Sequence, residues 1–325
     1  MKELIENFSL QINEALQIGE AHSFKTKQRT FTNVVICGLG GSGIGGSFVK
    51  DVTIGEIDIP INLVKGYFLP KFANENSLVI ISSYSGNTEE TLNCLQEALE
   101  RNLTICAISS NGKVKQICKE NGLDCIPIPG GNPPRASLGY SATQLFFILA
   151  HFGLISDKFK ELLGKASELI KNDLSNIQSE AKNLADKLQD KIPVLYSSNH
   201  IESVAVRWRQ QINENGKQLC WHNVVPEMNH NELVGWREKN EKLAVVFLRN
   251  DNDFSKVATR MDLNKKVYET YTSSIHEIWS KGNSLIERAI YLMILGDWVS
   301  FYLAEFRDFD VTEVKVIDEL KANLS

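Results

Sequence analysis

Val34-Val-Ile-Cys-Gly-Leu-Gly-Gly-Ser-Gly-Ile-Gly-Gly46 decides the fold class, together with Ser82-Ser-Tyr-Ser-Gly-Asn-Thr-Glu-Glu-Thr91 further along the chain. Each stretch passes from apolar, strand-like residues into a loop of small residues and then into a helix. Neither loop contains Lys or Arg. A phosphate bound here would therefore be held by backbone N–H groups, helix N-termini and hydroxyl groups.

Five residues of these loops are candidates for binding that phosphate: Gly41, Ser42, Ser83, Ser85 and Thr88. The four side chains can each donate a hydroxyl hydrogen to a phosphate oxygen. The glycine lets the main chain approach the ligand closely. Each loop alone is equally compatible with ordinary N-caps and turns. The presence of both favours a phosphate site.

Two nucleotide-binding motifs compete with this interpretation. Gly38-x-Gly40-x-x-Gly43 matches the dinucleotide fingerprint, which also requires an acidic residue at the end of the next strand. That strand ends Leu63-Val-Lys-Gly-Tyr67, without Asp or Glu. No Gly-Lys-Ser/Thr follows the glycines either, so the Walker pattern fails. We therefore expect no nucleotide cofactor.

Composition narrows the class of protein. The chain has 325 residues, enough for two domains, with 43% hydrophobic and 23% charged residues. A net charge of −5 and the lack of a basic stripe argue against nucleic-acid binding. The apolar stretch 289–303 is interrupted by Gly296-Asp297 and is too short to span a bilayer.

The cysteines and the N-terminus indicate the compartment. The six cysteines form no Cys-x-x-Cys pair, and the charged start Met1-Lys-Glu-Leu-Ile-Glu does not resemble a signal peptide. Reduced thiols in a cytoplasmic protein are expected. No cluster of His, Cys and carboxylate residues has metal-ligand spacing, so no metal is expected.

Apolar strands alternate with helical patterns, which predicts an α/β fold with parallel sheets flanked by helices on both faces. The expected strands are 34–39, 61–65, 78–83, 104–108 and 125–128 in the first half, and 193–199, 243–248 and about 267–271 in the second. The expected helices include 89–101, one or two helices over 157–191, then 285–306 and 312–324.

The two halves are expected to be two domains, residues 1–155 and 156–325, related as a structural repeat. The repeat does not extend to the chemistry. Arg249-Asn-Asp-Asn-Asp253 replaces the hydroxyl-rich loop in the second half, and its carboxylates would repel a phosphate. One phosphate site is expected, in the first domain.

The pair of small-residue loops resembles the sugar isomerase (SIS) domain, and four further segments narrow the resemblance. They are Pro129-Gly-Gly-Asn-Pro-Pro-Arg-Ala-Ser-Leu-Gly-Tyr140, Asn213-Glu-Asn-Gly-Lys217, Pro226-Glu-Met-Asn-His-Asn-Glu232 and Val314-Lys-Val-Ile-Asp-Glu-Leu-Lys321. Together they are similar to the bifunctional phosphoglucose/phosphomannose isomerases of archaea and bacteria. The resemblance covers the chain from about residue 33 to its end.

The resemblance implies two SIS-type domains and an aldose–ketose isomerase without cofactor. Glucose 6-phosphate and mannose 6-phosphate would be converted to fructose 6-phosphate through a cis-enediol. By resemblance Glu214 is the base that moves the proton, and His230 and Lys321 assist ring opening. Arg135 would hold charge near C1 and C2. The family histidine reaches into the neighbouring subunit's site, which implies a homodimer.

Each of these residues also has a simpler interpretation. Glu214 could be a solvated carboxylate at a helix end, and Arg135 a loop residue paired with a carboxylate. His230 could be structural, although its loop is unusually polar. Lys321 interrupts an apolar stripe in the last helix and could merely cover that surface with its stem.

Activity on both epimers requires room beside C2, and Thr312 or Val314 could provide it. The family usually carries Asp-Pro-Thr-Pro there, whereas this chain has Asp310-Val-Thr-Glu313. Loss of both prolines makes activity on the mannose epimer the less secure expectation. Two other functions are compatible with the SIS resemblance. One is a non-catalytic, sugar-phosphate-binding regulatory protein, and the other is the isomerase half of an aminotransferase.

Overall fold

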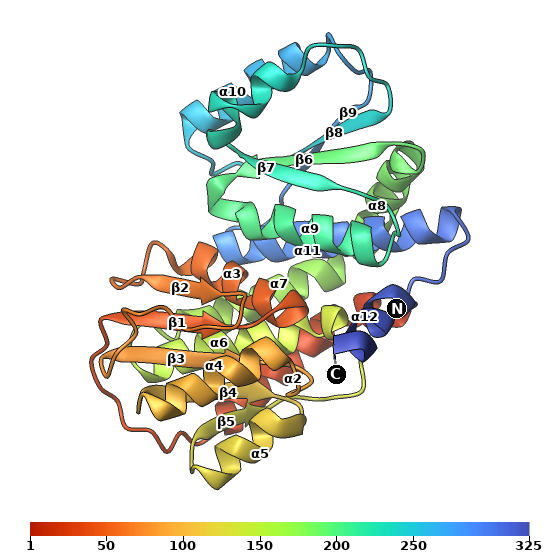
Figure 1. Ribbon diagram of the computed structural model, residues 1–325. Helices are drawn as coiled ribbons and strands as arrows, with labels where there is room; N and C mark the ends of the chain where they lie inside the picture. The colour runs from red at the N-terminus through yellow and green to blue at the C-terminus, as the bar shows by residue number, and fades with distance from the viewer. Residues whose placement is uncertain (325) are drawn as a thin grey trace. The chain divides into compact units, whose positions relative to one another are not determined.

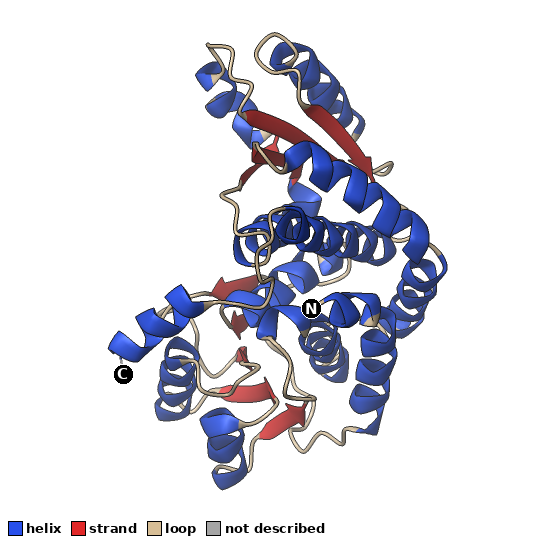
Figure 2. Ribbon diagram, turned by 90° about the vertical axis from the view of Figure 1, so that its right-hand side faces the viewer, coloured by secondary structure: helices blue, strands red, loops and turns tan. Residues whose placement is uncertain are grey.

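The computed structural model describes residues 1–324, which form two compact units. The first is Asn7–Glu168, and the second joins Met1–Glu6 to the chain from Leu169 onward. Each unit is a parallel sheet flanked by helices (Figures 1 and 2), which confirms the predicted α/β class. The boundary falls at 168/169 rather than at 155/156. The start of α7 (Lys158–Asn172) belongs to the first unit, where Phe159 stacks on Phe146 with ring centroids 5.4 Å apart.

The first sheet has the strand order β2-β1-β3-β4-β5. Its strands are β1 (Asn33–Cys37), β2 (Ile61–Val64), β3 (Ser77–Ser82), β4 (Thr104–Ser109) and β5 (Asp124–Pro127). All pair in parallel, and all five were predicted within two residues at each end. Their carboxyl ends therefore meet at one edge, where the two small-residue loops begin.

Helices cover both faces of this sheet (Figure 1). Helices α4 (Glu89–Glu100) and α5 (Gly112–Glu120) pack on one face. Helices α3 (Gly40–Thr53) and α6 (Leu138–His151) pack on the other, and α2 (Phe8–Ala21) lies against α6. The apolar side chains between the sheet and α4 form a fully buried core.

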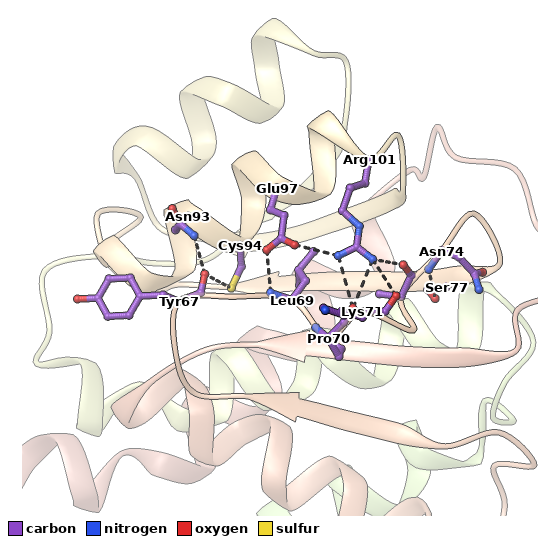
Figure 3. Close-up of polar contacts among 11 residues, drawn as sticks. Tyr67, Leu69, Pro70, Lys71, Asn74, Ser77, Asn93, Cys94, Glu97 and Arg101 are labelled. Carbon is purple, nitrogen blue, oxygen red and sulfur yellow. Dashed lines mark hydrogen bonds and ion pairs between the residues drawn. The ribbon is translucent and has the colours of Figure 1, made fainter.

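Two side chains of α4 and that of Arg101, the residue after it, hold the connection between β2 and β3 (Figure 3). Asn93 donates to the carbonyl of Tyr67 at 2.7 Å, and the Glu97 carboxylate accepts from the N–H of Leu69 at 2.8 Å. Arg101 pairs with Glu97 at 2.9 Å. The carbonyl groups that accept from Arg101 belong to Pro70, Lys71 and Ala73. The connection is thereby fixed to the helix that begins at one of the small-residue loops.

The second sheet has the order β7-β6-β8-β9 and is also parallel. Its strands are β6 (Ile192–Ser198), β7 (Trp221–Val225), β8 (Leu243–Arg249) and β9 (Ile275–Trp279). Helix α9 (Glu202–Glu214) packs against β6 and β7, and α8 (Leu174–Leu188) and α9 both contact α11 (Leu285–Phe306). Helix α10 (Ser255–Tyr268) lies on the other face (Figure 1).

The prediction for the second unit was partly wrong. The segment 267–271 is not a strand, because Val257, Met261 and Tyr268 place the end of α10 in the core. Strands β7 and β9 were not predicted. Both lie at edges of the sheet, where polar residues interrupt the apolar run.

Helix α11 is the one helix within residues 1–324 that is long and apolar enough to cross a membrane by length and composition. Of its most apolar stretch of 18 residues, 78% is buried inside the protein. It also carries Asp297, which pairs with Arg207 of α9 at 2.6 Å. Helix α11 is therefore the core helix of the second unit.

The Arg207–Asp297 pair generates a stability prediction. Both side chains are buried, and Gln211 donates to the second carboxylate oxygen at 3.0 Å. Arg207→Met leaves a buried carboxylate without its cation, which should lower the free energy of unfolding by about 3–5 kcal/mol. Chemical denaturation measures this. Lys165→Met, which removes an exposed ion pair with Glu161, should lower the free energy of unfolding far less. Equal effects of the two substitutions would contradict the prediction.

Candidate active site

The two small-residue loops lie side by side at the carboxyl edge of the first sheet. Strands β1 and β3 pair in parallel, with Cys37 opposite Ile81, so the loops that follow them leave the sheet together. The hydroxyl of Ser42 accepts from the buried N–H of Tyr84 at 3.1 Å, which joins one loop to the other. Helices α3 and α4 therefore begin at one place, with their positive ends together.

Glycines allow a third loop to join them. A Cβ at Gly41 would lie 2.6 Å from the carbonyl oxygen of Pro134, and one at Gly43 would lie 2.5 Å from that of Gly38. Pro134 begins the short helix η1 (Pro134–Ala136), which packs on α3. The absence of a side chain at Gly41 thus lets the segment with Arg135 lie against the start of α3, and its absence at Gly43 lets α3 lie close to the end of β1.

The predicted hydroxyl groups all belong to this cluster. Ser42 and Ser83 are buried, whereas Ser85 is exposed and Thr88 is half-buried. The hydroxyls of Ser83 and Thr88 lie 3.2 Å apart, and Ser85 accepts from the N–H of Asn87 at 3.2 Å. A hydroxyl that accepts one hydrogen bond keeps its own hydrogen for a ligand oxygen. The five predicted residues of the first unit form what we call the anion cup, defined by Gly41, Ser42, Ser83, Ser85 and Thr88.

Arg135 is buried beside the cup, with 5% of its surface exposed. Its segment is held by Gln11 of α2, a residue that sequence reasoning missed. The Gln11 amide donates to the carbonyl of Ala136 at 2.9 Å and accepts from the N–H of Gly139 at 2.7 Å. Helix α2 therefore fixes the position of the arginine from outside the loop.

Lys65 is a second residue that the sequence analysis did not assign to the site. It follows β2, the strand beside β1, and its ammonium group donates to Ser47 of α3 at 3.0 Å. Its Cε lies 3.8 Å from the position of a Cβ at Gly43. The sequence showed this lysine at the end of a strand, but the strand order that places it near α3 could not be read from the sequence.

In the second unit Glu214 is the last residue of α9 and is half-buried. The residues after it are fixed against α11. The Asn215 side chain is fully buried and donates to Ser300 at 3.0 Å. A Cβ at Gly216 would lie 2.8 Å from the carbonyl oxygen of Ile212. The backbone of Glu214 is therefore held rigidly while its side chain keeps access to solvent.

His230 belongs to a loop that is anchored on both sides but leaves its imidazole exposed. Met228 is fully buried in the core under α10. The Glu232 carboxylate accepts from Asn223 at 2.6 Å and from the hydroxyl of Tyr196. Met228 and Glu232 thus fix the loop on both sides of His230. Neither of these anchors requires the imidazole of His230 to face solvent.

Glu214 and His230 lie near opposite ends of the strands of the second sheet. Because β6 and β7 are parallel neighbours, α9 returns the chain from the carboxyl end of β6 to the amino end of β7. Strand β7 then leads to the carboxyl edge, where the loop with His230 begins. Five residues at a rise of about 3.3 Å separate the two ends of β7 by about 13 Å. Within one chain, these two residues are not brought together.

Lys321 lies on α12 (Lys315–Leu324) and is exposed. The apolar residues on this helix are exposed as well: Val316 is 79%, Ile317 40% and Leu320 60% accessible. Of the predicted stripe Val314, Ile317, Lys321 and Leu324, the side chain of Leu324 lies outside the described residues. The turn before α12 is held by Asp310, whose carboxylate accepts from the N–H and the hydroxyl of Thr312 at 2.8 and 2.7 Å.

The chemistry of these groups suits a small organic phosphate. The anion cup offers hydroxyls and helix N-termini, and the second unit offers a carboxylate, an imidazole and an ammonium group for proton transfer. Within the described part of the chain, no group of three His, Cys, Asp or Glu side chains is arranged to hold a metal ion.

The packing at Gly41 generates a binding prediction. Gly41→Ala forces a Cβ against the Pro134 carbonyl, so the arginine segment or α3 must shift. We expect about a tenfold loss of affinity for inorganic phosphate, or about 1.4 kcal/mol, in calorimetric titration. Gly66→Ala is the matched control, since a Cβ there meets open space. Unchanged phosphate affinity in Gly41→Ala would contradict the placement of the cup.

Comparison with known proteins identifies the family. Residues 177–324 match the model of the bacterial phospho-glucose isomerase C-terminal SIS domain. The bifunctional phosphoglucose/phosphomannose isomerase of Caldicellulosiruptor bescii is 39% identical over 100% of this chain and 99% of its own length. That of Aquifex aeolicus is 37% identical over 90% of this chain and 91% of its own.

Solved structures agree on the fold. The C-terminal domain of glucosamine-fructose-6-phosphate aminotransferase from Francisella tularensis superimposes with a TM-score of 0.77 at 15% identity, over 96% of this chain and 98% of that one. Both units therefore have the SIS architecture that the loops predicted. On sequence identity and coverage, the chain belongs to the bifunctional phosphoglucose/phosphomannose isomerase family.

Proposed function

We propose that this protein is an aldose–ketose isomerase that converts glucose 6-phosphate and mannose 6-phosphate to fructose 6-phosphate. The observation that carries the proposal is the anion cup, in which two helix N-termini and four hydroxyl-bearing residues gather without an acidic nucleotide-binding partner. The named activity of the curated relatives supports the same reaction.

Proton transfer is assigned to Glu214. Its carboxylate removes the proton from C2 of the open-chain aldose, which leaves a cis-enediolate, and returns the proton to C1. O1 gains a proton and the O2 hydroxyl loses one, so that the carbonyl group moves from C1 to C2. Arg135 stabilises the negative charge that develops on the enediol oxygens. His230 and Lys321 exchange protons with the ring oxygen and the C1 hydroxyl, so that the ring opens before the transfer. The cup holds the phosphate throughout the reaction.

Activity on both epimers follows from the shared enediol, provided that nothing hinders the C2 hydroxyl. We assign that room to the segment with Thr312 and Val314. This turn lacks the two prolines that the family resemblance leads us to expect, but Asp310 holds it, because its carboxylate accepts from the N–H and the hydroxyl of Thr312. We therefore infer that the turn stays ordered and that the mannose activity is retained.

A homodimer in which His230 acts on the partner's substrate is part of this proposal. Glu214 and His230 of one chain lie at opposite edges of a sheet, so one reaction can use both only if they come from different copies. Exposed apolar side chains lie before, at the start of and after the edge strand β7: Leu219 is 78%, Trp221 42% and Val234 66% accessible. A second copy would cover such a surface.

The non-catalytic alternative is not favoured. A regulatory sugar-phosphate sensor needs the cup but has no use for Glu214, His230 and Lys321 together.

We further infer a cytoplasmic location, in keeping with six unpaired cysteines, of which five are buried.

The base assignment predicts the outcome of one substitution. Glu214→Gln keeps the shape of the side chain but cannot take a proton, so kcat should fall by about a hundredfold to ten-thousandfold, with KM little changed. A coupled assay and deuterium exchange at C2 in heavy water measure this. Glu269→Gln is the matched control, since Glu269 is an exposed carboxylate at the end of α10. Normal exchange by Glu214→Gln would exclude Glu214 as the base.

The dimer predicts complementation between two inactive variants. Glu214→Gln and His230→Ala chains are co-expressed with different tags and purified as mixed dimers. If His230 acts on the partner's substrate, each mixed dimer contains one site with both native residues and should show about half the wild-type activity. If His230 acts within its own chain, no site is complete and the mixed dimers stay inactive.

A further inference from the structure

Lys217 occupies an unusual backbone conformation just after the proposed base. Its φ of 51° lies in the left-handed region, which lysine rarely adopts. The turn this produces directs the side chain back along the chain. The ammonium group donates to the carbonyl oxygen of Glu214 at 2.6 Å. A residue held in such a conformation needs a compensating interaction, and this contact provides one.

The same ammonium group also bonds a distant segment. It donates to the carbonyl oxygen of Glu313, so one cation joins two backbone positions far apart in the sequence. Glu313 lies two residues before the last helix, and its side chain accepts from the N–H of Lys315, the first residue of α12. The position of Glu313 therefore determines where α12 starts, and α12 carries Lys321.

Neighbouring contacts reinforce this junction. Arg307, which follows α11, donates to the carbonyl oxygens of Gly216 at 3.1 Å and Lys217 at 3.3 Å. The end of α9 and the segment after α11 thus meet around residues 216 and 217. Lysine supplies up to three donors on one flexible stem, which suits a group that must reach two carbonyl oxygens at once.

We propose that Lys217 is a positioning residue that fixes the base Glu214 and the ring-opening Lys321 relative to each other. This inference rests on the proposed function of those two residues. A purely structural alternative exists, because basic side chains commonly bond the last carbonyl oxygens of a helix. A purely structural role would lower the stability of the protein but would not lower kcat while KM stays unchanged.

The test compares Lys217→Met, Lys217→Asn and Lys217→Arg in the full-length protein. Asparagine tolerates the left-handed conformation but is too short to reach both carbonyl oxygens. This variant therefore separates the effect of the backbone conformation from the effect of the ammonium group. Arginine keeps the charge and the donors. Lys191→Met is the control, because the Lys191 ammonium bonds one carbonyl oxygen elsewhere in the same unit, that of Glu241.

We expect kcat to fall about tenfold to a hundredfold in Lys217→Met and Lys217→Asn, with KM within about twofold of wild type. Backbone amides of residues 313–321 should exchange hydrogen at least tenfold faster in both variants. Lys217→Arg should recover most of the activity, and Lys191→Met should change neither measurement. Should Lys217→Met fail to fold, Lys217→Asn gives the same readouts.

Wild-type kcat and wild-type exchange of residues 313–321 in Lys217→Asn would overturn the inference. The Glu214→Gln variant, assayed in parallel, separates the two levels of proposal. If Glu214→Gln is inactive while Lys217→Asn is unaffected, only the positioning role fails. If Glu214→Gln turns over normally, the assignment of Glu214 as the base fails, and the positioning role of Lys217 fails with it.

Discussion

The candidate site depends on how closely three pieces of backbone approach one another at the edge of the first sheet. Side chains at Gly38, Gly41 or Gly43 would collide with carbonyl oxygens within 3 Å, so only glycine lets the three segments meet. The hydrogen bond from Tyr84 to Ser42 then links the two main loops. Helix dipoles and hydroxyls supply the attraction for an anion, and Arg135 lies buried beside them. The binding of a sugar phosphate that we propose here therefore depends first on the close packing of the backbone and only then on charge.

The second unit uses the same architecture for a different purpose. Its sheet also ends in loops at one edge, but Asp251 and Asp253 occupy the place of the hydroxyl-rich loop. The groups proposed for chemistry stand instead at the end of α9 and in the loop after β7. Because a parallel crossover returns the chain to the opposite end of the strands, these groups lie apart within one chain, and the homodimer that we propose would bring them together from two copies. The two units can therefore share one fold while one is proposed to bind the phosphate and the other to supply the groups for proton transfer.

Much of this could be predicted from the sequence, and the reasons for the failures are physical. The buried strands β1 and β3 are continuous apolar runs followed by glycine and serine, which gives a strong local pattern. Edge strands β7 and β9 mix polar and apolar residues because one side faces solvent, so their pattern is weak. Gln11 and Lys217 act through contacts with residues far along the chain. Such pairs follow from tertiary packing and leave no local trace.

The six residues at the N-terminus belong to the second unit, where Ile5 is buried and α1 (Lys2–Glu6) packs on α11. During synthesis, the unit of residues 7–168 is complete before most of the second unit has left the ribosome. Residues 1–6 and α11 can pack together only after the whole of residues 7–284 between them has been made. The unit that holds the anion cup can therefore complete its own contacts on the ribosome before the unit that carries Glu214 does.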